Sequence, residues 1–283
     1  MLYYSAALLI GFLILFRSAD QFVMGSVATA RNLNITPMTI GLTVVALGTS
    51  APEIFVSASS SFHGEPGIAV GNAIGSNIAN IGMVLGSTAL IVPLRFRVDI
   101  LRYDLPILVF ITVCAGVCLV DLYLGIWDGL LLISALLVFL YRIRAEHKRS
   151  SSMEVVAEIS DLEEFPDMSE KRAILKLFLS LIFLLFSSEL LVWAAIGIAQ
   201  YLGVSELVIG LTVIAVGTSI PELVVSLTSV LKGQTDLAIG NIVGSNIFNI
   251  LTVLSIPAIF APSTLEPLTL WRDYGLMLGM TLL

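Results

Sequence analysis

The chain consists largely of apolar runs that are each long enough to cross a lipid bilayer. Of its 283 residues, 57% are hydrophobic and 12% are charged, whereas a soluble domain carries roughly 25% charged residues. A hydrocarbon core of about 30 Å needs about 20 apolar residues per helix. By that measure we expect nine spans, the last of them short, near 2–30, 37–61, 66–93, 104–120, 122–141, 172–201, 206–231, 236–261 and 270–283. Because the runs are continuous and do not alternate as barrel strands do, the sequence predicts an all-α integral membrane protein.

The basic residues predict how these spans are oriented. If the N-terminus lies outside, the inward-facing connections hold 12 of the 14 Lys and Arg residues: Arg31, Arg95, Arg97, Arg102, Arg142, Arg144, Lys148, Arg149, Lys171, Arg172, Lys176 and Lys232. The positive-inside rule therefore predicts a multi-pass protein of the cell membrane with its N-terminus outside and the polar loop 144–171 in the cytoplasm. This loop carries eight acids between Glu146 and Glu170, and a solvated connector is favoured over a regulatory cation-binding segment.

Two long segments of the chain are copies of each other. Residues 41–82 and 210–251 align without a gap at an offset of 169 and are identical at over half of their positions. Five spans precede the second half, so the two copies enter the membrane from opposite sides. The sequence thus predicts an inverted repeat, with a first half at 1–143 (repeated core 41–86) and a second at 172–283 (repeated core 210–255). Many secondary transporters share this architecture, and their substrate sites lie at the midplane between the repeats.

The first repeated motif is GTSxPE, at residues 48–53 and 217–222. Pro52 and Pro221 have no amide hydrogen for the preceding turn, so each is expected to break its helix and free carbonyl oxygens near 46–48 and 215–217. Glu53 and Glu222 follow directly. A charged residue inside a membrane helix costs at least about 2.5–3.5 kcal/mol and normally marks an ion or proton path.

The second repeated motif is GNxxGSN. It sets Asn72, Ser76 and Asn80 four residues apart on one helix face, and it repeats the stripe as Asn241, Ser245 and Asn249. The glycines of the first copy, Gly67, Gly71 and Gly75, are expected to let two helix backbones approach closely. Asn77 and Asn246 are interpreted as residues that hydrogen-bond between helices.

The donor set predicts the kind of ion. It is all oxygen and carries two formal negative charges, which suits Ca²⁺ and Na⁺ and argues against Zn²⁺ or Cu⁺. One Ca²⁺ neutralises both carboxylates, whereas several Na⁺ would occupy the same oxygens, so each load excludes the other. His63 and His147 are predicted in loops. Cys114 and Cys118 are interpreted as packing residues and not as a metal pair.

These repeated segments resemble the paired alpha repeats of the calcium/cation antiporter superfamily, in particular its Na⁺/Ca²⁺ exchanger branch. The resemblance implies ten spans in two inverted five-span halves, so that this chain lacks the tenth. It implies a Ca²⁺ site made by Glu53, Glu222 and the backbone oxygens of Thr49 and Thr218. It also implies flanking Na⁺ sites, made by Ala46, Ser50 and Ser76 in the first copy and by Ala215, Ser219 and Ser245 in the second. It implies that Asn80 and Asn249 line the middle of the site. Asn72 and Asn241 are possible accessory residues.

The resemblance also bears on the counter-ion. Family members often have Asp at one middle position, whereas this chain has Asn at both, which leaves the formal charge at −2. The H⁺/Ca²⁺ branch typically carries a Glu shortly after GN, where this chain has Gly75 or Gly244. Electrogenic Na⁺/Ca²⁺ exchange is therefore expected, with H⁺/Ca²⁺ exchange as the alternative.

Other classes of function fit the sequence less well. An intramembrane hydrolase would need a base beside a nucleophile or a metal-bound water, but the chain has no HExxH motif and no histidine in a span. We therefore expect no enzymatic activity, no cofactor, no nucleic acid and no protein partner, only the two transported ions and the bilayer. Asp20 and Glu189, which correspond in the repeat, are either gate residues or partners of Arg17 and nearby hydroxyls.

Overall fold

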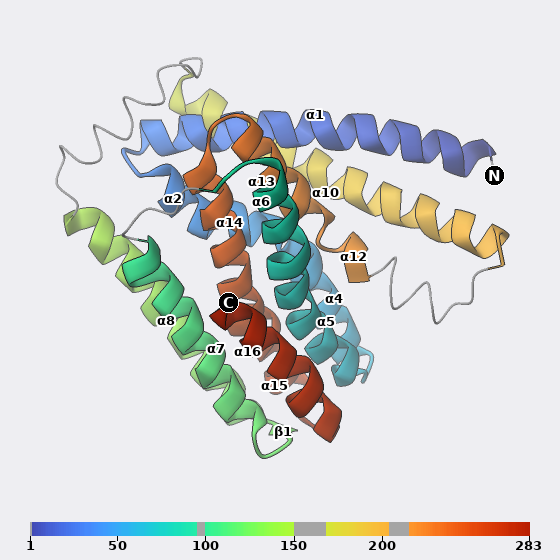
Figure 1. The fold of residues 1–283 in the computed structure, drawn as a ribbon, viewed down its shortest axis with the longest axis vertical. Helices are drawn as coiled ribbons and strands as arrows, with labels where there is room; N and C mark the ends of the chain where they lie inside the picture. Colours follow the sequence, from blue (N-terminus) through green and yellow to red (C-terminus); the bar gives the residue numbers. More distant parts are fainter. Residues whose placement is uncertain (1, 95–99, 150–167, 204–214) are drawn as a thin grey trace.

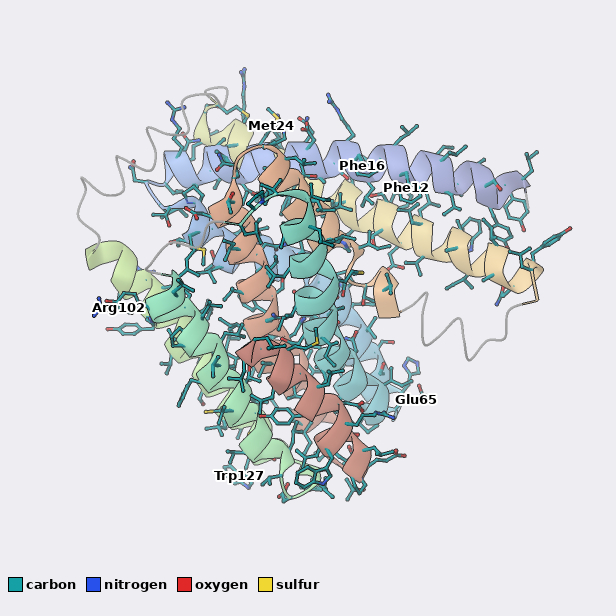
Figure 2. The ribbon with its side chains drawn as sticks, viewed as in Figure 1. Phe12, Phe16, Met24, Glu65, Arg102 and Trp127 are labelled. Atoms are coloured by element: carbon teal, nitrogen blue, oxygen red, sulfur yellow. The ribbon has the colours of Figure 1, made fainter. Side chains whose placement is uncertain are left out.

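A computed structural model describes residues 2–94, 100–149, 168–203 and 215–283. Arg95 and Arg97, most of the predicted loop 144–171 and the first part of the predicted span 206–231 lie outside these residues. Within them, six helical segments are long and apolar enough to cross a membrane. They run over Leu2–Asn32, Pro66–Ile91, Ile100–Leu119, Ile126–Ala145, Glu170–Tyr201 and Thr235–Phe260. Large apolar side chains such as Phe12, Phe16 and Trp127 point outward from them and are about half or more exposed (Figure 2), as expected for lipid-facing surfaces.

Three of these spans contain a π-helical segment. The first is α5 (Pro66–Ala79), η2 (Asn80–Leu85) and α6 (Gly86–Ile91). The second is η3 (Ile100–Asp104) and α7 (Leu105–Leu119), and the third is α14 (Thr235–Phe248), η5 (Asn249–Val253) and α15 (Ser255–Phe260). The other long helices are α1 (Leu2–Asn32), α8 (Ile126–Arg149) and α10 (Glu170–Tyr201). Since α8 continues to Arg149, His147 lies in a helix, and its prediction as a loop residue is wrong.

The two proline-containing segments are broken helices. The first comprises α2 (Pro37–Ile40), η1 (Gly41–Val45), α3 (Ala46–Thr49) and α4 (Ala51–Phe62), and it bends by 43° after Thr49. The second is described as α12 (Ala215–Gly217) and α13 (Ile220–Leu231). Ser50 (φ −80°, ψ 8°) and Ser219 (φ −90°, ψ 5°) sit at the two breaks, and each proline is the second residue of the helix that follows. A proline in the first turn needs no hydrogen-bond acceptor, so the break forms where it is predicted.

The helices α1 and α10 lie side by side and run across the remaining helices (Figure 1). A Cβ atom placed on Gly25 would lie 2.8 Å from the backbone nitrogen of Leu177, so this glycine permits the close contact. The buried residues of α1, α10 and α13 form one apolar cluster, and those of α5, α7, α8, α14 and α15 form another. The polar centre described below lies on α3, α4, α5, α13 and α14, which connect the two clusters.

Glycines of α14 bring its backbone close to α2 and η1 of the first repeat. A Cβ atom placed on Gly240 would lie 2.6 Å from the Met38 carbonyl oxygen and 3.1 Å from the Cα of Gly41. At Gly67, Gly71 and Gly75 the structure has nothing within 4 Å of such an atom among the described residues. The close approach predicted for these three glycines is therefore not seen within the described part of the chain. Residues 204–214, which contain the repeat counterpart of Gly41, lie outside it.

The connections after the fourth and eighth spans meet in a short antiparallel pairing. The strands β1 (Tyr123–Leu124) and β2 (Ser263–Thr264) pair Tyr123 with Thr264 and Leu124 with Ser263. The predicted span order places both connections on the same side of the membrane, which this pairing requires. The chain then continues through η6 (Thr269–Tyr274) into α16 (Gly275–Leu282), where the Tyr274 hydroxyl donates to the Thr112 carbonyl of α7 at 2.9 Å.

Candidate cation site

Two carboxylates from the two repeats are buried at the centre of the molecule. Glu53 lies in the first turn of α4 and Glu222 in the first turn of α13, and both side chains are 0% exposed. They are close enough to interact electrostatically. Neither carboxylate oxygen of Glu53, nor Oε2 of Glu222, has a hydrogen-bond partner among the described residues. Buried charges are expensive unless they are compensated, so three unpartnered oxygens in one place indicate a position for a cation or a proton.

Hydroxyl groups of the first repeat reach into the second. The Ser50 hydroxyl donates to Glu222 Oε1 at 3.2 Å. The Thr49 hydroxyl donates to Asn241 Oδ1 at 3.1 Å and lies 3.4 Å from the Ser245 hydroxyl. On the other side of the pseudo-two-fold axis, Thr218 and Ser76 are the side chains beside the Glu53 carboxylate. Each glutamate is thus approached by the threonine of the opposite repeat, and neither repeat forms the centre alone.

Asn72 and Asn241 hold the glutamates by their backbones. The Asn72 amide donates to the Glu53 carbonyl at 3.0 Å, and the Asn241 amide donates to the Glu222 carbonyl at 3.4 Å. Asn241 also donates to the Ser226 hydroxyl at 3.0 Å. The same bond thus occurs in both copies, so these two asparagines fix each GTSxPE break against the following helix. They support the centre and do not direct their amide nitrogens into it.

The remaining polar side chains at the centre are buried, and several are unpartnered. Asn80 and Asn249 are 1% and 0% exposed, and neither side chain makes a hydrogen bond among the described residues. They are the first residues of η2 and η5, at matching places in the two repeats. The Ser219 hydroxyl is likewise buried and unpartnered. Ser76 and Ser245 are buried beside them, one turn before the two asparagines. π-Helical turns often occur at functional sites.

The backbone oxygens at the two breaks differ between the copies. The Ala46 carbonyl still accepts the Ser50 amide at 3.0 Å and the Thr49 hydroxyl at 3.3 Å, so its predicted release from the helix is wrong. A carbonyl has two lone pairs, and the helix continues to Thr49 before it bends. In the second copy the Ser219 amide bonds to Val216 at 3.2 Å, which is one residue nearer than in an α-helix. Ala215 begins α12 at this break.

Asn77 and Asn246 do not make the predicted hydrogen bonds between helices among the described residues. Asn77 donates to the Ala73 carbonyl of its own helix at 2.8 Å. Asn246 is 1% exposed and has no hydrogen-bond partner for either polar atom among the described residues, as is also true of the Thr252 hydroxyl. Thr252 lies just beyond the aligned segment 210–251, so no repeated motif pointed to it. Asn246 shares the repeated GSN motif, which is the signal that would have placed it with the unpartnered donors.

The centre offers two negative charges and otherwise neutral oxygen donors. Among the described residues no group of three or more His, Cys, Asp or Glu side chains could hold a metal ion. Cys114 is half-buried and Cys118 buried, and neither forms a disulfide. The donors suited to a hard cation are therefore carboxylate, hydroxyl and amide oxygens.

Inverted, broken helices that meet at buried carboxylates define a membrane transporter of cations. Residues 3–144 and 172–283 match the family model described as "Sodium/calcium exchanger protein", and the chain belongs to this family, which consists of exchangers and not of enzymes. It is 40% identical to the inner membrane protein YrbG of Escherichia coli over 100% of this chain and 88% of YrbG. It is 44% identical to a CaxA protein of Alkalimonas amylolytica over 97% of this chain and 86% of CaxA.

Two relatives are named as exchangers of sodium and calcium. The chain is 30% identical to the sodium/calcium exchanger MaX1 of Methanosarcina acetivorans, over 98% of this chain and 88% of MaX1. A structure of the sodium-calcium exchanger NCX_Mj, soaked with 2.5 mM Na⁺ and 0.1 mM Ca²⁺, superposes with a TM-score of 0.84 at 32% identity. That match covers 100% of this chain and 89% of the NCX_Mj chain. The predicted family and fold class are confirmed.

Proposed function

We propose that this chain exchanges Na⁺ for Ca²⁺ by alternating access and that the exchange is electrogenic. The observation that carries the proposal is the buried pair Glu53 and Glu222, one from each repeat, with three carboxylate oxygens that no described residue bonds. One Ca²⁺ would neutralise both charges, with Thr49 and Thr218 at the two breaks beside it.

Na⁺ would take the flanking oxygens. In this proposal Ser50, Ser76 and the backbone oxygen of Ala46 from the first repeat would bind one group of Na⁺ ions, and Ser219, Ser245 and the backbone oxygen of Ala215 from the second would bind the other. Asn80 and Asn249 would line the middle, where their unpartnered amide oxygens can face either ion. Because both loads use the same two carboxylates, they exclude each other, and this exclusion couples the two fluxes.

The same unpartnered carboxylates could instead carry protons, so the counter-ion must be tested directly. The purified chain is reconstituted in vesicles loaded with Na⁺, diluted into Na⁺-free buffer, and assayed for uptake of ⁴⁵Ca²⁺. We expect uptake to depend on the outward Na⁺ gradient. We also expect the rate of uptake to differ between vesicles whose interior is made negative and vesicles whose interior is made positive by a K⁺ diffusion potential.

The competing function predicts a different pattern. Vesicles without Na⁺ receive a pH gradient of matched size, acidic inside. Uptake driven by this gradient as well as by Na⁺ would replace the proposal with H⁺/Ca²⁺ exchange. Uptake that follows the Na⁺ gradient but is insensitive to the membrane potential would keep the ions and overturn the electrogenic part.

A further inference from the structure

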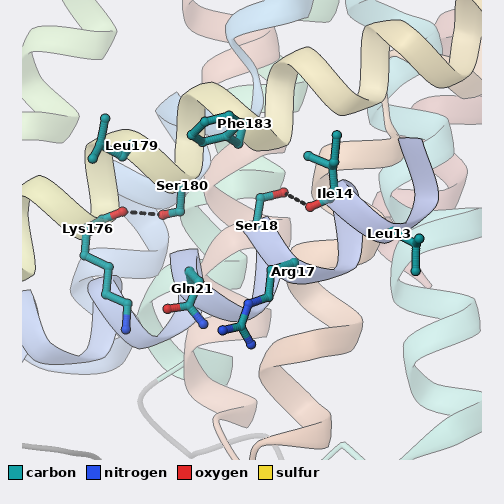
Figure 3. A pocket seen from close by; sticks show the side chains of 9 residues that line it. All are labelled: Leu13, Ile14, Arg17, Ser18, Gln21, Lys176, Leu179, Ser180 and Phe183. Atoms are coloured by element: carbon teal, nitrogen blue, oxygen red, sulfur yellow. Dashed lines mark hydrogen bonds between the residues drawn. The ribbon is translucent and has the colours of Figure 1, made fainter. Parts of the chain in front are cut away.

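A groove of about 450 Å³ lies between α1 and α10, away from the cation site (Figure 3). Its walls include the apolar side chains Leu13, Leu179 and Phe183. Three polar side chains, Arg17, Gln21 and Lys176, extend to one side of the two helices and end near one another in this view. The groove thus combines an apolar trough with a basic rim, which is the pattern of an amphiphile with a negative head group.

Within the described residues the two basic groups of the rim form no ion pair, although the Asp20 carboxylate is near enough to Arg17 to interact with it electrostatically. Arg17 and Lys176 make no salt bridge among the described residues. The acid nearest to Arg17 along α1 is Asp20, and its carboxylate is already engaged by Lys232 at 2.6 Å and by the Gln21 amide at 2.8 Å. An Arg near the middle of a membrane helix costs at least about 2.5–3.5 kcal/mol, so an external negative charge would stabilise it.

The internal repeat shows that helix packing does not require these charges. At the offset of 169 residues, Arg17 corresponds to Phe186, Gln21 to Leu190, and Lys176 to Ala7. The corresponding positions of the repeat therefore carry no charge and no amide. The charges occur only on the side that the distribution of basic residues predicts to be cytoplasmic.

We propose that this groove binds an anionic phospholipid of that leaflet. Its phosphate would be held by Arg17 and Lys176, and one acyl chain would lie against Leu13, Leu179 and Phe183. A lipid is favoured over a free anion because the greater part of the groove is apolar and opens toward the membrane-facing surface of the two helices.

The proposal is tested by native mass spectrometry of the detergent-purified chain titrated with phosphatidylglycerol or phosphatidylcholine. We expect phosphatidylglycerol to bind more tightly at the first site. Arg17→Gln and Lys176→Gln should each weaken its binding about fivefold, as expected for one basic residue at a membrane surface. The double variant should bind the two lipids alike, and circular dichroism should show unchanged helix content in all variants.

Arg172→Gln is the matched control, because Arg172 is an exposed basic residue of α10 outside the groove. It should keep the full preference for phosphatidylglycerol. Equal binding of both lipids to the unaltered chain, or an equal loss in the Arg172 variant, would overturn the proposal. Displacement of the lipid by millimolar inorganic phosphate would show an anion site instead, and would overturn it as well.

A second observation concerns the ion pair between Asp20 and Lys232. Lys232 Nζ lies 2.6 Å from Asp20 Oδ1, and the pair joins α1 to the end of α13. The repeat relates Asp20 to Glu189 and Lys232 to His63. In this structure the related pair is not formed among the described residues, since the His63 ring contacts the Ser59 carbonyl at 2.7 Å and Glu189 is exposed.

The helices that carry these residues show the same asymmetry. α1 packs closely against α13, whereas the symmetry-related pair α10 and α4 has no comparable packing in the described part of the chain. In an inverted-repeat transporter, exchanging the conformations of the two repeats produces the opposite-facing state. We infer that Asp20–Lys232 is a latch that closes one side, and that Glu189 and His63 form its counterpart when the other side closes. This inference rests on the proposed alternating access.

The latch is tested by measuring the distance between two spin labels, a measurement that requires no ion gradient. Spin labels are placed at Glu65→Cys, beside the end of α4, and at Phe186→Cys on α10, in a background carrying Cys114→Ala and Cys118→Ala. We expect Lys232→Gln to increase, by up to about fivefold, the population of molecules in which the two labels are close together. This factor corresponds to about 1 kcal/mol for a partly exposed ion pair.

His63→Lys should shift the same population in the same direction, because it strengthens the opposite pair. Arg172→Gln, which removes a basic residue elsewhere on α10, should leave the distances unchanged. An unchanged distribution in the Lys232 variant would overturn the latch even if transport is intact. Failure of the exchange assay alone, with shifted distances, would instead count against the proposed function.

Discussion

Glu53→Gln and Glu222→Gln should each lower Ca²⁺ affinity by about 100-fold or more and abolish measurable uptake driven by Na⁺. The substitution keeps the size of the side chain and removes one of only two formal charges at a fully buried site. Loss of one partner of a buried charge interaction costs about 2–5 kcal/mol, which corresponds to roughly 30- to 4,000-fold in affinity. Because the two residues come from different repeats, either change alone should suffice. Uptake of ⁴⁵Ca²⁺ into vesicles and calorimetric titration with Ca²⁺ measure the effect.

Glu65→Gln is the matched control, since Glu65 is an exposed glutamate that follows α4. Its uptake should equal that of the unaltered chain. The Gln variants should also retain their thermal stability or gain some, because each removes a buried charge that has one hydrogen bond (Glu222) or none (Glu53) among the described residues. A Glu222 variant with normal affinity would show that the second repeat does not contribute a charge to the site, and it would contradict the proposed ion exchange.

Gly240→Ala should lower the melting temperature of the detergent-solubilised chain by about 5–10 °C and reduce uptake with it. The added carbon would lie 2.6 Å from the Met38 carbonyl and 3.0 Å from the Leu42 amide nitrogen, and these are backbone atoms that cannot turn away. Overpacking of this kind costs about 1–3 kcal/mol, which is several degrees for a chain of this size. Asn241 is the next residue, so a displaced α14 would also disturb its bonds to Glu222 and Thr49.

Gly279→Ala is the matched control, for which the expected change in melting temperature is zero or of opposite sign. Gly279 also lies within a helix, α16, but no described atom is within 4 Å of an added carbon there. Alanine forms helices better than glycine by about 1 kcal/mol, so this variant should keep or slightly raise the melting temperature. Equal melting temperatures for the Gly240 and Gly279 variants would show that η1 and α14 are not packed backbone to backbone.

The apolar runs and the repeat predicted the parts of the fold that depend on length and on local chemistry. The breaks fall where Pro52 and Pro221 place them, because a missing amide hydrogen acts within one helical turn. The burial of Glu53 and Glu222 also followed, since a carboxylate in an apolar run of a membrane protein must face the interior. The partners of these residues were less predictable. That Thr49 bonds to Asn241 depends on how two distant segments cross, and no local pattern encodes that crossing.

Some of the errors arise because the two copies differ in detail. The Ala46 carbonyl accepts the amide of Ser50, four residues further on, whereas in the second copy the amide of Ser219 bonds to Val216, one residue nearer. A repeated sequence predicts equal chemistry in both halves, but a transporter held in one state packs its halves unequally. The sequence alone cannot indicate which copy is the more tightly packed.

The unpartnered oxygens at the centre have a consequence for how the folded state is maintained. Eleven buried side-chain atoms, eight oxygens and three amide nitrogens, lack a hydrogen bond among the described residues, and nearly all belong to the repeats. Each such atom lowers the stability of the fold relative to a chain with an apolar core. A cation bound by the oxygens among them would be a folding ligand as well as cargo, contributing about 2.7 kcal/mol when its concentration is 100 times its dissociation constant. The resistance of the chain to unfolding would then follow the ionic composition on the side of the membrane to which the site is open.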